Sequence, residues 1–127
     1  MIHLAPFEAA EEHLEYCHLL SVEREEGSFG FKIFSDEEKL GLCQIKFVGE
    51  AAYILALKGI KEKISVEMLA NVFTSVIEFL NRIGVASLVY PIQSEDDVVI
   101  CEATGFDRIS ETLYVFDFPT EETEKEE

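Results

Sequence analysis

Apolar residues recur at every second position in two neighbouring segments of the chain. The segment "SFGFKIF" has its apolar positions in phase from Phe29, and "LGLCQIKF" repeats the pattern from Cys43, with polar Gln44 and Lys46 between. A period of two is typical of β-strands, and the polar run "SDEEK" between the segments is typical of a turn. The pattern predicts an antiparallel hairpin, with one face of each strand in the core.

Two further segments are apolar at almost every position. These are "YILAL" at residues 53–57 and "ASLVYPI" at residues 86–92, and continuous apolar runs are typical of strands covered on both faces. Between them, from Ser65, apolar residues step by three and four up to Gly84, which predicts an amphipathic helix. Two buried strands joined by a helix are expected to form a right-handed parallel crossover.

The remaining elements lie at the two ends of the chain. A helix is expected with Pro6 as an early residue, because the residues that follow repeat at helical spacing. Its apolar side is expected to consist of Phe7, Ala10, Leu14 and Cys17. A second short helix begins at the cap Ser94 and ends at Gly105, and the strand "TLYVFDF" follows it. Residues 1–118 therefore predict a single α/β (α+β) domain, in which an antiparallel meander precedes a βαβ crossover in one mixed sheet.

The charge balance limits the possible partners. The chain has 26 acidic and 10 basic residues and a formal net charge of −16. Nucleic acids are bound by releasing counterions to Lys and Arg, so a nucleic-acid partner is not expected, and neither is an anionic membrane. Part of the charge lies in "PTEETEKEE", residues 119–127, which is expected to be a disordered acidic tail.

The sequence also indicates the compartment. No apolar run approaches the roughly 20 residues of a membrane helix, and the first residues lack the basic and apolar regions of a signal peptide. Cys17, Cys43 and Cys101 form no paired pattern, which favours a reducing environment. We therefore expect a cytoplasmic protein.

One pair of possible metal ligands occurs in the sequence. His13 and Cys17 lie four residues apart beside His18, but no third ligand follows at a suitable spacing. Surface histidines are the simpler interpretation, and no metal site is predicted.

The order of the elements resembles that of the GNAT acyltransferase superfamily over nearly the whole chain. The segments that carry the resemblance are "LGLCQIKFVGEAAYILAL" and "ATGF" at residues 103–106. The resemblance implies acetyl-CoA binding between two splayed parallel strands, here residues 53–57 and 86–90. The pantetheine arm would pair with main-chain groups of Ile54, Leu55, Ala56 and Leu57.

The resemblance also implies a pyrophosphate site at the loop and first turn of the long helix, "IKEKIS" at residues 60–65. The residues assigned to it are Lys61, Lys63, Ile64 and Ser65, with Ser94 at the position of an asparagine that the family often has. The family's glycines are absent here, and Glu62 and Glu67 would repel a phosphate, whereas the lysines favour an anion. The alternative is an exposed charged loop in which Ser65 merely caps the helix.

One catalytic candidate follows from the resemblance, and the others follow from their places in the sequence. The family's tyrosine, which protonates the leaving thiolate, corresponds to Cys101; a free thiol with a pKa of about 8.5 can serve as a general acid. The alternative is a buried helix cysteine. Glu50 is the candidate base, with Tyr53 and Tyr90 as hydroxyls that orient a water; alternatively, Glu50 is only a turn residue.

Three hypotheses for function remain open. The first is an acetyl-CoA-dependent N-acetyltransferase for a small amine, with a cationic acceptor attracted by the acidic surface. The second is a GNAT-like binding module that has lost catalysis, since the loop glycines, the tyrosine and the asparagine have all changed. The third is a dimer formed through exposed edges of the strands "SFGFKIF" and "LYVFDFP". A monomer and a homodimer are both compatible with the sequence.

Overall fold

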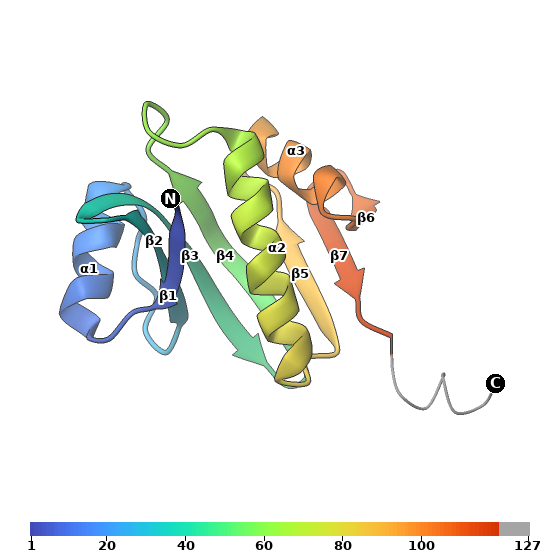
Figure 1. The fold of residues 1–127 in the computed structure, drawn as a ribbon. Coiled ribbons are helices and arrows are strands. Elements are labelled where there is room, and N and C mark those ends of the chain that lie inside the picture. The colour runs from blue at the N-terminus through green and yellow to red at the C-terminus, as the bar shows by residue number, and fades with distance from the viewer. Residues whose placement is uncertain (120–127) are drawn as a thin grey trace.

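The computed structural model describes residues 1–119, which form one seven-stranded sheet and three helices (Figure 1). In chain order the elements are β1 (His3–Pro6), α1 (Ala10–Leu19), β2 (Phe29–Ser35), β3 (Glu38–Val48), β4 (Ala51–Gly59), α2 (Val66–Arg82), β5 (Ser87–Pro91), α3 (Glu95–Ala103), β6 (Asp107–Ser110) and β7 (Leu113–Asp117). The acidic tail predicted for residues 119–127 lies outside the described residues except for its first position.

The sheet has the strand order β1-β2-β3-β4-β5-β7-β6 and is mixed. Strands β4 and β5 are parallel, and every other neighbouring pair is antiparallel. The predicted hairpin is β2 and β3, and the predicted crossover is β4, α2 and β5. The mixed α/β fold class expected from the hydrophobic pattern is thus confirmed.

Helices cover both faces of the sheet, and each covers a different part. Helix α2 crosses one face over β4 and packs beside α3, while α1 lies on the other face over β2 and β3 (Figure 1). The larger core lies under α2 and includes the fully buried Phe73, whose ring contacts Tyr90 and Phe106. A smaller apolar cluster under α1 includes Tyr16 and Leu42.

Strand β4 changes its pairing halfway along its length. Gln44 of β3 pairs with Ala56, but the next residue, Ile45, pairs with Ile54, so Leu55 is an extra residue in β4. This is a β-bulge, which bends a strand and increases its twist. On the other side, β4 pairs with β5 only through Ala51–Tyr53 within the described residues. The two parallel strands therefore part beyond Tyr53, and a gap opens toward their carboxyl ends.

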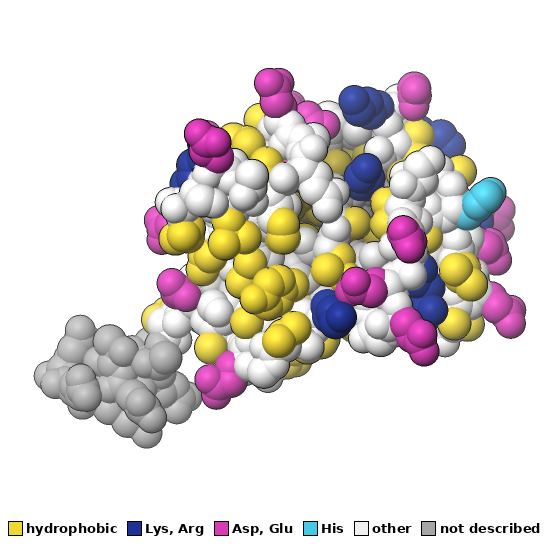
Figure 2. All heavy atoms as spheres, turned by 180° about the vertical axis from the view of Figure 1, so that it is seen from behind, with side chains coloured by type: hydrophobic (Ala, Val, Ile, Leu, Met, Phe, Trp, Pro, Cys, Tyr) yellow, Lys and Arg dark blue, Asp and Glu magenta, His cyan; other side chains and the backbone are white. Residues whose placement is uncertain are grey.

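Within residues 1–119, no helix covers one part of the sheet. Tyr53, Val89 and Val115 are direct neighbours on β4, β5 and β7, and they point away from the face that α2 covers. Tyr53 is exposed, and the two valines are half-buried. Figure 2 shows hydrophobic side chains gathered on this face of the molecule, beside the part that α1 covers.

The N-terminal prediction is wrong in two respects. Pro6 is not a helix residue but the last residue of β1, where it pairs with Phe31, and α1 begins only at Ala10. The buried side of α1 consists of His13, Tyr16 and Cys17, while Leu14 is 51% exposed. His13 is therefore a buried residue and not a surface histidine. The apolar count in this helix is too low for spacing alone to identify the buried face.

The strands at the edges of the sheet are not those that the third hypothesis requires. Strand β2 lies between β1 and β3, and β7 lies between β5 and β6, so neither aromatic strand is an edge. The edges are β1 and β6, two four-residue strands that the sequence analysis missed. Short edge strands of this kind limit pairing with other chains. The premise of the third hypothesis, that the two aromatic strands expose their edges, is therefore wrong.

The packing of α2 predicts the effect of removing its central ring. Substitution Phe73→Ala leaves a cavity between Tyr90 and Phe106 and is expected to lower the free energy of unfolding by about 3–5 kcal/mol. Phe47→Ala is the matched control, because Phe47 is 43% exposed and its loss should cost less than about 1 kcal/mol. Urea unfolding measures both, and equal losses would contradict this core assignment.

Candidate functional site

Two cavities lie beside the gap between β4 and β5. The first, the helix cavity, has a volume of about 430 Å³ and lies between the end of β4 and the first turns of α2 and α3. Its lining comprises Leu57, Lys58, Gly59, Lys61, Ile64, Ser65, Val66, Leu69, Gln93, Ser94, Asp96, Asp97 and Ile100. The second, the loop cavity, has a volume of about 420 Å³ and lies under the α1–β2 loop (residues 20–28). Its lining comprises Ser21, Val22, Glu23, Glu25, Gln44, Leu55, Ala56, Lys58 and Gln93.

The two cavities share Lys58 and Gln93. Lys58 lies near the end of β4, and Gln93 follows β5, so these residues flank the gap between the two strands. The bulge contributes directly, because Leu55 and Ala56 are consecutive residues and both line the loop cavity. An extended molecule lying in the gap would therefore contact both cavities.

The first turn of α2 supplies donors to the helix cavity. Ser65 caps the helix: its Oγ accepts from the Met68 N–H at 3.2 Å, and its carbonyl accepts from Leu69. The N–H groups of Val66 and Glu67 have no acceptor within residues 1–119, as is usual at a helix start. Together with Lys58 and Lys61, this end of the helix favours an anion, whereas Asp96 on the opposite wall opposes one.

The loop before α2 is a closed turn rather than an open phosphate cradle. The N–H groups of Lys63 and Ile64 both donate to the carbonyl of Ile60, at 2.9 and 3.0 Å. Position 59, directly before Ile60, requires a glycine, because a Cβ on Gly59 would lie 2.4 Å from the side chain of Ile64. Two N–H groups of this loop, those of Lys63 and Ile64, are therefore used internally, and the start of the helix and the lysines are available to an anion.

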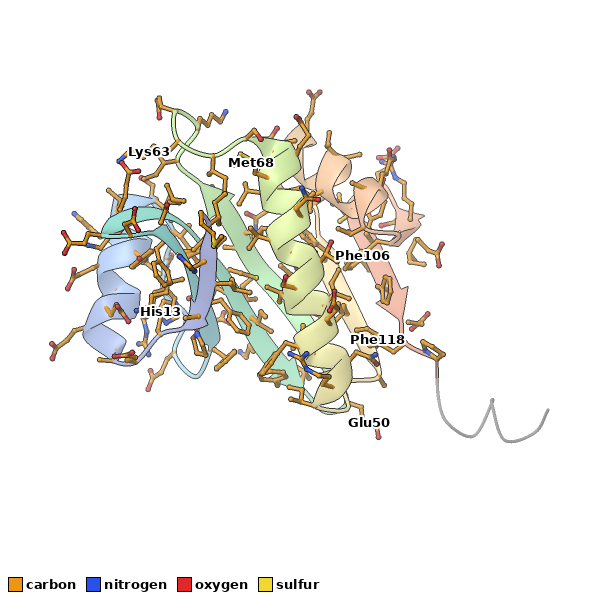
Figure 3. All side chains as sticks on the ribbon, in the orientation of Figure 1. His13, Glu50, Lys63, Met68, Phe106 and Phe118 are labelled. Atoms are coloured by element: carbon orange, nitrogen blue, oxygen red, sulfur yellow. The ribbon has the colours of Figure 1, made fainter. Side chains whose placement is uncertain are left out.

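Most of the residues implied for the cofactor line one of the cavities. Leu57, Lys61, Ile64, Ser65 and Ser94 line the helix cavity, and Leu55 and Ala56 line the loop cavity. Ile54 has its side chain in the core. Lys63 is not part of either lining: its Nζ lies 2.7 Å from Glu38 Oε2, and it points away at the tip of the loop (Figure 3). Of the two loop lysines expected in the anion site, only Lys61 lines the helix cavity. The second lysine of this lining is Lys58.

Tyr90 holds the start of α3 in place rather than facing a cavity. Its hydroxyl donates to Asp97 Oδ1 at 2.7 Å, and Asp97 Oδ2 accepts from the N–H groups of Gln93 and Ser94. Burial, followed by the nearby Asp97 charge, raises the pKa of Tyr90, so the hydroxyl keeps its proton. Tyr90 is 2% exposed, and this corrects the expectation that it orients a water.

Cys101 is also placed differently from its expected role. It is on the buried side of α3, fully inaccessible, and it is not part of either cavity lining. Burial, and then the charges of Asp97 and Glu102, raise the pKa of the Cys101 thiol to about 12. A thiol in this position neither reaches a ligand in the cavities nor releases its proton near neutral pH. The alternative interpretation, a buried helix cysteine, fits its surroundings.

Glu50 lies at the wrong end of β4 for a base. It is an exposed residue in the turn between β3 and β4, whereas both cavities lie at the other end of the strand (Figure 3). Seven residues separate it from Leu57, which corresponds to about 23 Å along a strand. Its turn interpretation is the one that agrees with the fold, since its carbonyl accepts from Ala86.

Several polar residues of the two cavities were not predicted from the sequence. Glu23, Glu25 and Gln44 line the loop cavity, and Gln93 lines both. Gln44 was assigned only to the polar face of its strand, yet it is 2% exposed. The sequence held one signal for Gln44: an amide side chain on a predicted strand, close in the sequence to an acidic loop. The structure adds that Gln44 pairs with the small Ala56.

Within residues 1–119 no group of three or more His, Cys, Asp and Glu side chains is arranged to hold a metal ion. No helix in this part of the chain is both long and apolar enough to cross a membrane.

Comparisons with known proteins identify the fold. No protein-family model and no curated protein matches the sequence. Among solved structures, the ribosomal-protein-S18-alanine N-acetyltransferase of Escherichia coli aligns with a TM-score of 0.77 and 11% identity, over 94% of this chain and 96% of that one. An acetyltransferase of Bacillus subtilis in complex with CoA aligns at 0.74 and 10%, over 94% and 100%. Mutant forms of the spermidine/spermine N-acetyltransferase of Vibrio cholerae align at 0.73 and 9%, over 92% and 95%.

These alignments cover nearly the whole of each chain at very low identity. They show that the protein has the GNAT acetyltransferase fold, as the resemblance of its sequence indicated. The parted strands and the two cavities are features of this chain's own geometry within that fold.

The buried thiols predict a loss of stability at alkaline pH. Burial raises the pKa of both Cys43 and Cys101 to about 12, so the unfolded chain releases these protons at a lower pH than the native state does. Stability should therefore fall as the pH rises from 7.5 to 9.5, by about 1 kcal/mol for each thiol. Urea unfolding at the two pH values measures the fall, and Cys43→Ala with Cys101→Ala should reduce it. An unchanged fall in the double variant would contradict this origin.

Proposed function

We propose, from the GNAT fold and the geometry of the gap, that the protein is an acetyl-CoA-dependent N-acetyltransferase for a small cationic amine. The observation that carries the proposal is the parting of β4 and β5 beyond Tyr53, with a cavity on either side that shares Lys58 and Gln93. Such a gap can hold a thioester between a cofactor site and an acceptor site. We infer a cytoplasmic enzyme, working as a monomer or a homodimer.

The residues of the helix cavity fit the diphosphate of CoA in charge and in donors. Lys58 and Lys61 supply positive charge, and the free N–H groups at the start of α2 supply directed donors. Main-chain groups of residues 54–57 are available to pair with the amides of a pantetheine arm, because β5 does not pair with them. Main-chain pairing needs no particular side chain, which is compatible with the changed loop.

Acetyl-CoA supplies an activated acetyl group as a thioester. The chain's part in the reaction is to hold that group beside an amine and to stabilise the charge on the carbonyl oxygen during attack. A strand N–H near Leu57 is suited to the second task. The neutral amine attacks the carbonyl carbon directly, the C–S bond breaks, and the proton that the amine loses passes through water to the departing thiolate. No covalent enzyme intermediate is required. Positioning of both partners in the gap accounts for most of the expected rate enhancement.

A cationic acceptor is supported by charge near the loop cavity. Glu23 and Glu25 line it, and the chain as a whole has a net charge of −16, which attracts cations at long range. One structure with the same fold is a spermidine/spermine N-acetyltransferase, whose acceptors are cationic amines. The common chemistry is a small molecule with an amino group and further positive charge.

One observation favours the alternative of a catalytically silent binding module. The position of the family's tyrosine holds Cys101, which is buried with a raised pKa, so it is not suited to protonate a leaving thiolate. A module of this kind would keep the fold and lose turnover. Loss of CoA binding would favour it over the enzyme.

Thermal unfolding with and without CoA tests the cofactor site. At a CoA concentration of about a hundred times its dissociation constant, binding adds roughly 2.7 kcal/mol and should raise the midpoint by several degrees. Lys61→Glu should abolish the rise, because Lys61 lines the helix cavity. Lys63→Glu is the matched control: it makes the same charge change two residues away, outside the lining, and should keep most of the rise.

Two results would contradict the proposal. No rise with CoA or acetyl-CoA at millimolar concentration would mean that the cofactor does not bind. Equal losses in Lys61→Glu and Lys63→Glu would mean that the loop charge acts at long range and that the helix cavity is not the site.

A further inference from the structure

Gln44 joins the sheet to the α1–β2 loop. It lies on β3 with its side chain under that loop and is 2% exposed. Its Oε1 accepts from the Glu25 N–H at 3.4 Å, and its Nε2 donates to the Glu23 carbonyl at 3.1 Å. Its Oε1 also lies 3.2 Å from the Ser28 hydroxyl, which shares its single proton with the Glu25 carbonyl at 2.6 Å. One buried amide thus contacts the loop at three residues.

The loop has a second anchor on α1. Arg24 Nε donates to Nδ1 of His13 at 3.4 Å. Burial and the Arg24 charge both lower the pKa of His13, so its ring stays neutral and Nδ1 can accept. Because Arg24 points toward α1 while the residues on either side of it bind Gln44 through their main chain, the loop conformation from residue 23 to residue 25 is well determined.

This conformation places two acidic residues in the lining of the loop cavity, and their side chains differ in their partners. Glu25 Oε2 lies 3.4 Å from Lys46 Nζ, which neutralises part of its charge. Glu23 has no basic side chain within ion-pair distance in residues 1–119. Glu23 is therefore the carboxylate of this cavity that is available to a ligand. Glu26 is in the same loop but does not belong to the lining.

We propose that Gln44 is a positioning residue for the amine acceptor: by holding the main chain of the loop, it directs Glu23 to bind an ammonium group of the substrate. This inference rests on the proposed function. The nitrogen that attacks a thioester must be neutral, whereas the nitrogen held by Glu23 stays charged. The acceptor is therefore a molecule with at least two amino groups, a diamine or a longer polyamine.

The test compares 1,4-diaminobutane with butylamine, which lacks the second nitrogen. Calorimetric binding to the CoA-loaded full chain is measured together with kcat and KM. Glu23→Gln should raise the Kd and the KM for the diamine about tenfold or more, and should leave those for butylamine and acetyl-CoA unchanged. Glu26→Gln is the matched control, with the same charge change in the same loop, and should leave all of these constants unchanged.

Gln44→Met keeps the size of the side chain and removes its hydrogen bonds. It should weaken diamine binding as Glu23→Gln does and accelerate amide hydrogen exchange at residues 23–28. In the Glu23→Gln background it should have little further effect on diamine binding, because both changes remove the same interaction. A merely structural role would give additive effects on the diamine and on acetyl-CoA. Should Gln44→Met fail to fold, Ser28→Ala, which removes one of the three contacts, takes its place in this double-mutant comparison.

Three results would overturn the inference: no binding of 1,4-diaminobutane to the wild-type chain, equal effects of Glu23→Gln and Glu26→Gln, or additive effects of the Gln44 and Glu23 substitutions. Calorimetry without CoA separates this inference from the proposed function. Diamine binding that depends on Glu23, in a chain that does not bind CoA, would refute the acetyltransferase and leave the recognition site standing.

Discussion

Main-chain hydrogen bonding between β4 and β5 ends at Tyr53 and Val89, and the functional geometry depends on that ending. Beyond this point β4 remains paired with β3, and β5 remains paired with β7, so each strand is held from its outer side. The bulge at Leu55 lies where the strands part, and its extra residue increases the local twist. Buried polar groups normally have partners, so unpaired main chain in the middle of a sheet marks a place for a ligand.

The charge distribution around the gap follows from a chain with few basic residues. On the α2 side, Lys58 and Lys61 lie beside the positive end of a helix, and these are the local exceptions in a strongly acidic protein. On the α1 side, Glu23 and Glu25 dominate. The α2 side therefore combines two lysines and the helix donors with the opposing charge of Asp96, and the α1 side combines two acidic residues with the shared Lys58. Lys58 belongs to both linings and lies at the boundary between them.

Hydrophobic periodicity predicted the elements whose burial is one-sided or complete, such as the hairpin β2–β3, the long helix α2 and strand β5. It failed where other forces decide. Pro6 pairs in a short edge strand, and the buried face of α1 consists of His13 and Tyr16, whose placement depends on contacts with Phe7. Of the residues implied for the cofactor, those at positions 55–57 and 64–65 line the cavities, because the course of the main chain brings them there. Glu50, Tyr90 and Cys101 were assigned by their positions along the chain, which do not define positions in space. In the structure Glu50 lies at the far end of β4, and Tyr90 and Cys101 lie in the core. No local sequence pattern marks Gln44 and Glu23, because their contact joins a loop to a strand that is distant in the sequence.

The central claim is that the parted segment of β4 binds the pantetheine arm of CoA through its main chain. Amide resonances of a ¹⁵N-labelled chain, followed during titration with CoA, test it most directly. The account predicts saturable shifts at residues 54–57 and at the first turn of α2, with β1 and β6 unaffected. Shifts confined to the amides of the loop at residues 60–63, or no shifts in β4 at saturation, would contradict it.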